Sequence, residues 1–479
     1  MDVLLQDVRS ALSRGEGIKA LLLDHSTKKA LSPLISHGEL LSYDFFLFET
    51  IDRERPPISV SCVAILTQQS LDLLVREVGA PRYGEYFVFV TDELSEDEIL
   101  QIAEKDVFGV VKELQELYIG NVPVDRSFFV TDEPDPRQSA RALVCLLRGM
   151  GISPRIRYLF GSEVSYKTAE VVLDAFVPDP ACNSDLLVLE RSFDLFTPLQ
   201  YSWTYQCMAA EYLHYTAGLI RWDTQTLPVS DNDHFFQDTK FKDILSATEY
   251  LSNSLKKIKA SREVVGEFVT TLRQRAKDSE RLIAHLQALS KVSAECLVND
   301  AVSETMADVI QGGCIDLKAV DTYTNAQKLR LALVARACAS ASDLSFARML
   351  WNDSPDYSGL CRAYPKEVEN FAKTFLMEKV CRKKPGYDKT KSRKLGYIPV
   401  LEKLLEKMQT DALSERAFPH LKNAPGENNV TVIFISGGAT LLEYKAMCEL
   451  FARRFPKKEC VLVSDKLVTA EDIIKSVKP

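Results

Sequence analysis

The segment LLVLERSFDLFTPLQYSWTYQCM, residues 186–208, is the most distinctive motif of this chain. It begins in the run DLLVLE (185–190), whose unbroken apolar character is typical of a strand buried on both faces of a parallel sheet. We expect Arg191 and Asp194 to lie close enough after this strand to form an ion pair, and Pro198 to fix the exit turn. Because structural ion pairs are commoner than catalytic ones, we interpret the segment as structural rather than catalytic.

Upstream of this segment, short runs rich in Val, Ile and Phe alternate with helical stretches. The runs are ALLLD (20–24), FFLFE (45–49), VAILT (63–67) and YFVFVT (86–91). Strand and helix in alternation predict a doubly wound parallel sheet with helices on both faces. A second block of the same kind runs from 137 to 190, so we expect two such sheets.

The C-terminal part supplies two more strands, VTVIFISGG (430–438) and ECVLVS (459–464), each followed by a helical pattern. Two strands alone make a marginal sheet in water. We therefore expect the C-terminus to complete the middle sheet.

Between Pro228 and Pro355 the chain contains no proline, and its apolar residues recur at near-helical spacing. We expect a long helical hairpin at 263–300 and further helices at 326–350, 366–380 and 397–409. The predicted fold class is α/β plus all-α, with two doubly wound parallel-sheet α/β domains and a large helical insertion. The predicted domains are an N-terminal one (1–122), a middle one (123–227 with 426–479) and a helical one (228–425).

The composition of the chain argues against several classes of function, beginning with nucleic-acid binding. The net charge of −8 and the pI near 5.5 give no global positive field for holding nucleic acid. The first residues lack a basic region followed by an apolar core, and no apolar run approaches the ~20 residues of a membrane span, which predicts a cytoplasmic protein. The eleven cysteines include no CxxC and the six histidines stand apart, so we expect reduced thiols, no metal site and no cofactor.

The turn Ser436-Gly437-Gly438-Ala439-Thr440 is the candidate for enzymatic chemistry. A strand, a glycine turn and a helix N-terminus can bind phosphate through backbone N–H groups. The turn contains no lysine, however, and the chain has no GxGxxG, GxxxxGK[ST] or GxSxG motif. The alternative is structural, with two glycines permitting a tight turn and Thr440 capping the next helix. A nucleotide- or phosphate-binding enzyme using residues 436–440 stays as a second function class.

A basic segment, CRKKPGYDKTKSRK (381–394), carries seven basic residues against Asp388 alone. Beside an anionic membrane such residues add about 1 kcal/mol of attraction each. An ordinary solvated loop is the alternative.

The segment 186–208 resembles the signature of the Sec/Munc (SM) family. The resemblance comprises an apolar strand followed by Arg191, Asp194, Thr197, Pro198, Trp203, Tyr205 and Gln206. Glu190 stands where the family usually has aspartate, and Cys207 where it usually has alanine. Further blocks, at 37–52, 80–90, 154–158 and 432–447, are similar to the vacuolar-protein-sorting branch of the family.

The resemblance implies three domains in an arch and a non-enzymatic regulator of SNARE-mediated vesicle fusion. Such a protein is expected to be a monomer that binds a syntaxin-type SNARE and the assembled SNARE complex. It would work in the cytoplasm on endosome and Golgi membranes, which it reaches through its partners. The exocytic branch at the plasma membrane is the alternative, because the basic 381–394 segment and YIPVLEKLLEKM after it also look exocytic.

The resemblance also places two binding surfaces. A pocket on the outside of the first domain would take the N-terminal peptide of the syntaxin, and its positions fall on Ile99, Val111, Leu114 and Leu117, although core burial is the alternative for each. The hairpin would contact the SNARE helix near Phe268 and Leu272. Relatives tend to carry a proline near this tip, and its absence here predicts an extended helix.

Overall fold

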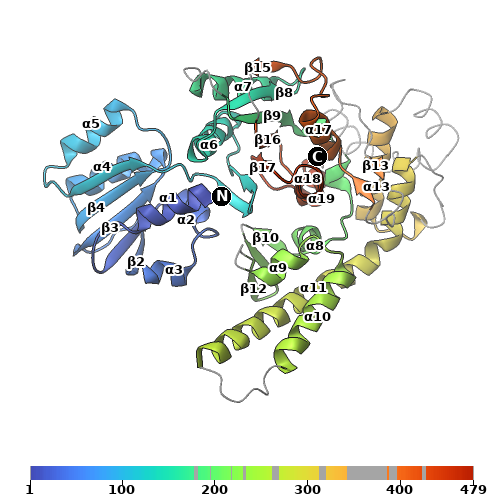
Figure 1. The fold of residues 1–479 in the computed structure, drawn as a ribbon, viewed down its shortest axis with the longest axis horizontal. Coiled ribbons are helices and arrows are strands. Elements are labelled where there is room, and N and C mark those ends of the chain that lie inside the picture. The colour runs from blue at the N-terminus through green and yellow to red at the C-terminus, as the bar shows by residue number, and fades with distance from the viewer. Residues whose placement is uncertain are drawn as a thin grey trace.

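The computed structural model consists of three lobes arranged as an arch (Figure 1). It describes residues 2–477 apart from 177–181, 195, 217, 230–232, 261–268, 312–319, 342–385, 388–395 and 423–427. Two lobes are α/β and the third is helical, as predicted. In Figure 1 the middle lobe stands between the first lobe and the helical one.

The first lobe is a five-stranded parallel sheet with the strand order β2-β1-β3-β4-β5. The strands are β1 (Lys19–Leu23), β2 (Phe45–Thr50), β3 (Ile58–Leu66), β4 (Tyr83–Val90) and β5 (Val111–Glu116). One face packs under α1 (Asp2–Leu12), α2 (His25–Leu31) and α3 (His37–Ser42), and the other under α4 (Leu71–Gly79) and α5 (Glu96–Lys105). Helices on both faces explain why these strands read as nearly continuous apolar runs. The predicted doubly wound sheet is confirmed.

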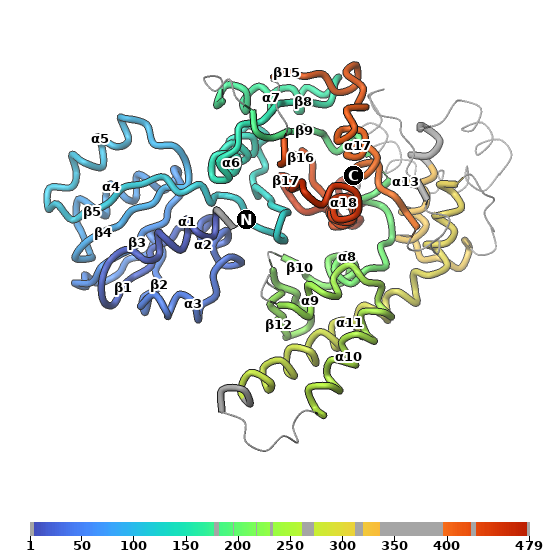
Figure 2. Tube along the Cα trace, in the orientation of Figure 1, coloured from blue at the N-terminus to red at the C-terminus, as the bar shows by residue number. Residues whose placement is uncertain are grey.

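The middle lobe is a seven-stranded sheet with the order β15-β8-β9-β16-β17-β7-β6. The strands are β6 (Val122–Asp125), β7 (Phe128–Val130), β8 (Pro154–Tyr158), β9 (Ser184–Glu190), β15 (His420–Lys422), β16 (Val430–Ser436) and β17 (Glu459–Ser464). The C-terminal strands β16 and β17 lie between β9 and β7, all in parallel, and Figure 2 shows this C-terminal segment inside the middle lobe. The helices of this lobe are α6 (Pro136–Gly149), α7 (Glu163–Ala175), α18 (Leu441–Arg454) and α19 (Ala470–Val477). The domain boundaries stay a prediction.

The helical lobe is joined to the middle sheet through α8 (Tyr205–Tyr212) and a small antiparallel sheet that the sequence did not predict. That sheet comprises β10 (His214–Thr216), β11 (Leu219–Trp222) and β12 (Gln225–Pro228). The remaining described elements are α9 (His234–Thr239), α10 (Ile244–Ala260), α11 (Val269–Gln311), α13 (Asn325–Ala341), α17 (Val400–Gln409), β13 (Gly386–Tyr387) and β14 (Tyr397–Ile398).

The hairpin differs from its predicted bounds. We expected two arms within 263–300, but Val269–Gln311 is one continuous helix whose antiparallel partner is α10. Apolar periodicity does not show where the chain reverses direction in a stretch without proline. The pattern therefore predicted helical structure correctly but placed the turn between the two arms wrongly. The predicted helix at 326–350 is described up to Ala341, and the one at 366–380 lies outside the described residues, as does most of the basic segment 381–394.

Candidate functional site

Arg191, the first residue after β9, is buried and binds two residues of the C-terminal segment. Its guanidinium donates to the Glu443 carboxylate at 2.9 and 2.6 Å and to the Gly438 carbonyl at 3.1 Å. Burial acts to lower the pKa of Arg191, but Glu443 outweighs it and raises that pKa. The expected ion pair with Asp194 is wrong, since Arg191 donates only to the main-chain carbonyl of Asp194, at 3.0 Å.

The Asp194 carboxylate accepts hydrogen bonds from backbone N–H groups. It accepts the backbone N–H groups of Phe196 and Thr197 at 2.9 and 3.1 Å, which shapes the short 3₁₀ turn at Thr197–Leu199 that contains Pro198. It also accepts the N–H of Val400, the first residue of α17, at 3.3 Å. Asp194 therefore ties the turn after β9 to the start of α17.

Gln206 points into a buried cluster around Asp125 at the end of β6. The Asp125 carboxylate accepts from Gln206 Nε2 and Lys240 Nζ, each at 2.6 Å, and from the Tyr444 hydroxyl at 2.9 Å. Burial, followed by the charge of Asp125, raises the pKa of Tyr444, which keeps it protonated as a donor. These contacts join α8, α18 and β6.

The two aromatic signature residues contact α11. Trp203 Nε1 donates to the Ser303 hydroxyl at 3.1 Å, and the Tyr205 hydroxyl lies 2.9 Å from His285 Nδ1. The signature segment is therefore a buried junction between the sheet and the long helix. Its polar groups are used inside the protein, as expected of a structural motif.

The 436–440 turn does not offer an anion site. Gly437 and Gly438 have φ of 91° and 107°, values that suit glycine. The N–H of Gly437 donates to the Asp465 carboxylate at 2.8 Å, and the N–H of Thr440 donates to Glu443 at 2.9 Å. Thr440 and Glu443 form a capping box. Because two carboxylates already accept the N–H groups a phosphate would need, the phosphate-binding alternative is not supported.

The residues predicted for the outer pocket differ in their burial. Ile99, on α5, is 43% exposed. Val111 and Leu114, on the edge strand β5, are half-buried and pack against the core under α4 and α5. Leu117 is wrong as a pocket wall, because it is 5% exposed and belongs to the core on the opposite face of the sheet.

The long helix α11 buries one face and exposes the other. Leu282, His285, Leu289 and Val292 are buried. Two residues of a helix that are two positions apart point in nearly opposite directions, so the exposed face runs between these positions. We name it the α11 stripe: Ile283, Gln287, Ser290, Ala294, Leu297 and Ala301, all exposed and none charged. Of the predicted hairpin residues, Leu272 lies in the α11 helix and Phe268 lies outside the described residues.

Comparison with known proteins assigns the family. The family model described as the Sec1 family matches residues 19–476 of this chain. The chain belongs to the Sec1 family. Its match to vacuolar protein sorting-associated protein 45 of Saccharomyces cerevisiae is 27% identical, covering 66% of this chain and 64% of that relative. The matched segment thus spans less than two thirds of the relative's length.

Solved structures of other proteins share this fold. One is the SM protein Vps45 in complex with the Qa SNARE Tlg2 (1–310), with a TM-score of 0.83 and 20% identity over 99% of this chain and 97% of that one. Another is Sly1p in complex with an N-terminal peptide of Sed5p, with a TM-score of 0.77 and 15% identity over 100% and 93%. The predicted family and fold are confirmed.

Three residues that support the signature were missed from the sequence. Glu443, Asp125 and His285 lie 252, 81 and 80 positions from their signature partners. No local pattern connects residues so distant. The one available signal was Glu443 as part of a capping box, which gave no hint that the same carboxylate would bind Arg191.

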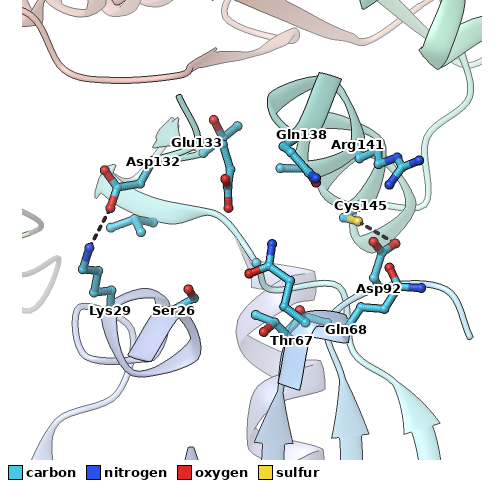
Figure 3. Close-up of a pocket in the computed structure, with 16 residues that line it drawn as sticks. Ser26, Lys29, Thr67, Gln68, Asp92, Asp132, Glu133, Gln138, Arg141 and Cys145 are labelled. Carbon is cyan, nitrogen blue, oxygen red and sulfur yellow. Dashed lines mark hydrogen bonds and ion pairs between the residues drawn. The ribbon is translucent and has the colours of Figure 1, made fainter. Parts of the chain in front are cut away.

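A cavity of about 400 Å³ lies between the first and middle lobes (Figure 3). Figure 3 shows Lys29 and Asp132 paired at one end, and Cys145 donating to Asp92 at the other, at 2.8 and 3.2 Å. Each contact joins a residue of one lobe to a residue of the other. Glu133 also lines this cavity. Burial and the charges of Asp132 and Asp135 raise the pKa of Glu133. We interpret this cavity as a polar seam between two lobes.

Over the described ranges, no three His, Cys, Asp or Glu residues are grouped as metal ligands. In the same part of the chain, no helix has the length and apolar character needed to cross a bilayer. Burial raises the pKa of the Cys62 and Cys460 thiols, which disfavours the reactive thiolate form.

Proposed function

We propose that this protein regulates SNARE-mediated membrane fusion by binding a syntaxin-type SNARE and promoting assembly of the SNARE complex, without a catalytic step. Membership of the Sec1 family supports this, as do the complexes of Vps45 with Tlg2 and of Sly1p with a Sed5p peptide. The α11 stripe is the observation on this chain that carries the proposal.

The α11 stripe has the pattern of a helix-binding face. Ile283, Ser290 and Leu297 are seven residues apart, as are Gln287, Ala294 and Ala301, which is the spacing of a coiled-coil seam. Leu297 is 79% exposed and its neighbour Val298 63%. The serine and the alanines allow another helix to approach closely. A long uncharged helical face left in water fits a partner that is itself a helix.

The first lobe carries a second exposed apolar surface. Leu41, Phe46 and Phe48 are 40%, 58% and 41% exposed on α3 and the edge strand β2. Beside them is a mainly apolar pocket of about 350 Å³, lined by Leu21, Ile35, Leu40 and Phe48 among others. In Figure 1, α3 and β2 lie at the end of the first lobe that is nearest the α10–α11 hairpin.

We propose that the N-terminal peptide of the syntaxin binds on the outer surface of the first lobe. This is supported by the positions of Ile99, Val111 and Leu114. The nearby α5–β5 connection adds two exposed apolar side chains, Val107 at 82% and Phe108 at 66%. Leu117 is not part of this proposal.

We place the protein in the cytoplasm, bound through its partners to endosome or Golgi membranes. The vacuolar protein sorting name of the yeast relative supports this branch. The exocytic alternative rested partly on the basic 381–394 segment, nearly all of which lies outside the described residues.

A pull-down of syntaxin-type SNAREs tests the proposal. Leu297→Asp should abolish capture, because an unpaired charge within a helix–helix interface is costly. Leu245→Asp is the matched control, since Leu245 is 82% exposed on α10, outside the stripe. Both variants should melt like the wild type. Capture of no SNARE by the wild type, or equal capture by both variants, would refute the proposed function.

A further inference from the structure

A buried chain of polar side chains runs from the signature segment to the inner face of α11. The Tyr205 hydroxyl lies 2.9 Å from His285 Nδ1, and His285 Nε2 lies 3.1 Å from Asp233 Oδ2. The three residues are at most 1% exposed, and they come from α8, α11 and the N-cap of α9. Three separate elements therefore meet at one imidazole.

The partners fix the tautomer of His285. A carboxylate only accepts, so the ring carries its proton on Nε2, facing Asp233. Nδ1 then accepts the proton of the Tyr205 hydroxyl, which stays a phenol because burial raises its pKa. The other Asp233 oxygen accepts the N–H of Phe236 at 3.1 Å. With a neutral imidazole, each of these hydrogen bonds therefore joins one donor to one acceptor.

Aromatic packing fixes the plane of the imidazole as well. The Phe236 ring stacks on His285 with an interplanar angle of 13° and a centroid distance of 6.1 Å. Tyr205 meets the same phenylalanine edge-on, at 5.6 Å and 74°. His285 is therefore held by two directed hydrogen bonds and by a stacking partner.

His285 lies between Ile283 and Gln287 in the helix, on the face opposite the α11 stripe. Rotating α11 about its axis to break the His285 contacts would turn the stripe away by the same angle. The neighbouring apolar contacts, such as Leu282 and Leu289, favour burial but are not directional. A buried polar contact can select one helix register among several apolar packings.

We propose that Tyr205 and His285 are positioning residues that set the rotation of α11 and so determine how the α11 stripe faces a partner helix. The inference rests on the proposed function for the identity of the partner. The Tyr205–His285 contact itself is a property of this chain and is testable without any partner.

The test compares two buried Tyr→Phe variants of the full chain. Tyr205→Phe removes the donor to His285 and keeps the ring. Tyr215→Phe is the matched control: its hydroxyl donates to the Val124 carbonyl at 3.1 Å and accepts from Gln206, with no contact to α11 in these bonds. Hydrogen exchange of the α11 amides and affinity for the captured syntaxin-type SNARE are measured for both.

We expect faster exchange over 280–300 in Tyr205→Phe alone, and binding weakened roughly five- to tenfold, the range for one buried hydrogen bond. A structural role without positioning predicts that both variants weaken binding only in proportion to their loss of melting temperature. Equal exchange of α11 in the two variants would overturn the inference. If the wild type binds no SNARE, the proposed function fails, whereas the exchange comparison still decides the inference.

Discussion

Arg191 and Glu443 form a buried two-point ion pair across 252 positions of the chain, with N–O distances of 2.9 and 2.6 Å. The pair joins the carboxyl end of β9 to the first turn of α18. Glu443 also completes the capping box with Thr440, so one carboxylate serves the start of a helix and the signature arginine. The signature segment and the C-terminal segment therefore depend on each other.

Glu443→Gln should strongly destabilise the protein. Removing one partner leaves a buried, uncompensated guanidinium, which typically costs about 3–5 kcal/mol. Urea unfolding measures the change. Glu471→Gln is the control, because its ion pair with Lys475 is exposed and should contribute little. A similar unfolding midpoint for the two variants would contradict the role given to Glu443.

Gly438→Ala should be poorly tolerated. Its φ of 107° disfavours any Cβ, and a Cβ there would lie 1.8 Å from Val468 Cγ2. Strain and overpacking each cost roughly 1–3 kcal/mol. Gly38→Ala in α3 meets no atom within 4 Å and should instead be neutral or stabilising. Thermal melts compare the two, and a Gly438→Ala variant that melts like the wild type would disprove the close approach.

The two α/β sheets and their most apolar strands were predictable, because long apolar runs such as VTVIFISGG need burial on both faces. The strands β5, β6, β7 and β15 were not predicted. The partners of the signature were not predictable, because pairs such as Arg191 and Glu443 are set by tertiary packing. The prediction that Leu117 lines the outer pocket was wrong for a simpler reason. Leu114 and Leu117 are three residues apart, a spacing that shares a face in a helix but not in an extended chain.

Ile99→Arg should prevent binding of a syntaxin N-terminal peptide while leaving the melting temperature unchanged, because Ile99 is 43% exposed. Leu117→Arg should instead lower the melting temperature sharply, since the arginine would be buried without a partner. Calorimetry with the peptide and a melt of each variant separate these results. Full peptide binding by a well-folded Ile99→Arg variant would remove the outer pocket from the proposal.

Asp24 should make stability depend on pH in the acid range. Burial acts to raise its pKa, but hydrogen bonds from Thr27, Thr67 and Ser70 outweigh it and hold the pKa below its ordinary value. A lowered folded-state pKa contributes stability above the unfolded value of about 3.9, and that stability is lost as the pH falls through the folded pKa. Asp24→Asn should therefore be less stable at pH 7, with a difference that shrinks below about pH 4. A difference independent of pH between 7 and 2 would contradict this assignment.

We propose that a syntaxin-type SNARE helix lies along the α11 stripe, and a photo-crosslinking scan of α11 tests this contact. A photoreactive amino acid replaces Ser290, Ala294 or Leu297 on the stripe, or the exposed Lys277 or Glu295 beside it. We predict crosslinks to the SNARE helix from the three stripe positions and none from the two others. Crosslinks from Lys277 and Glu295 alone would show that the SNARE helix does not lie on the α11 stripe. Crosslinks from no position, while the SNARE remains bound, would show the same.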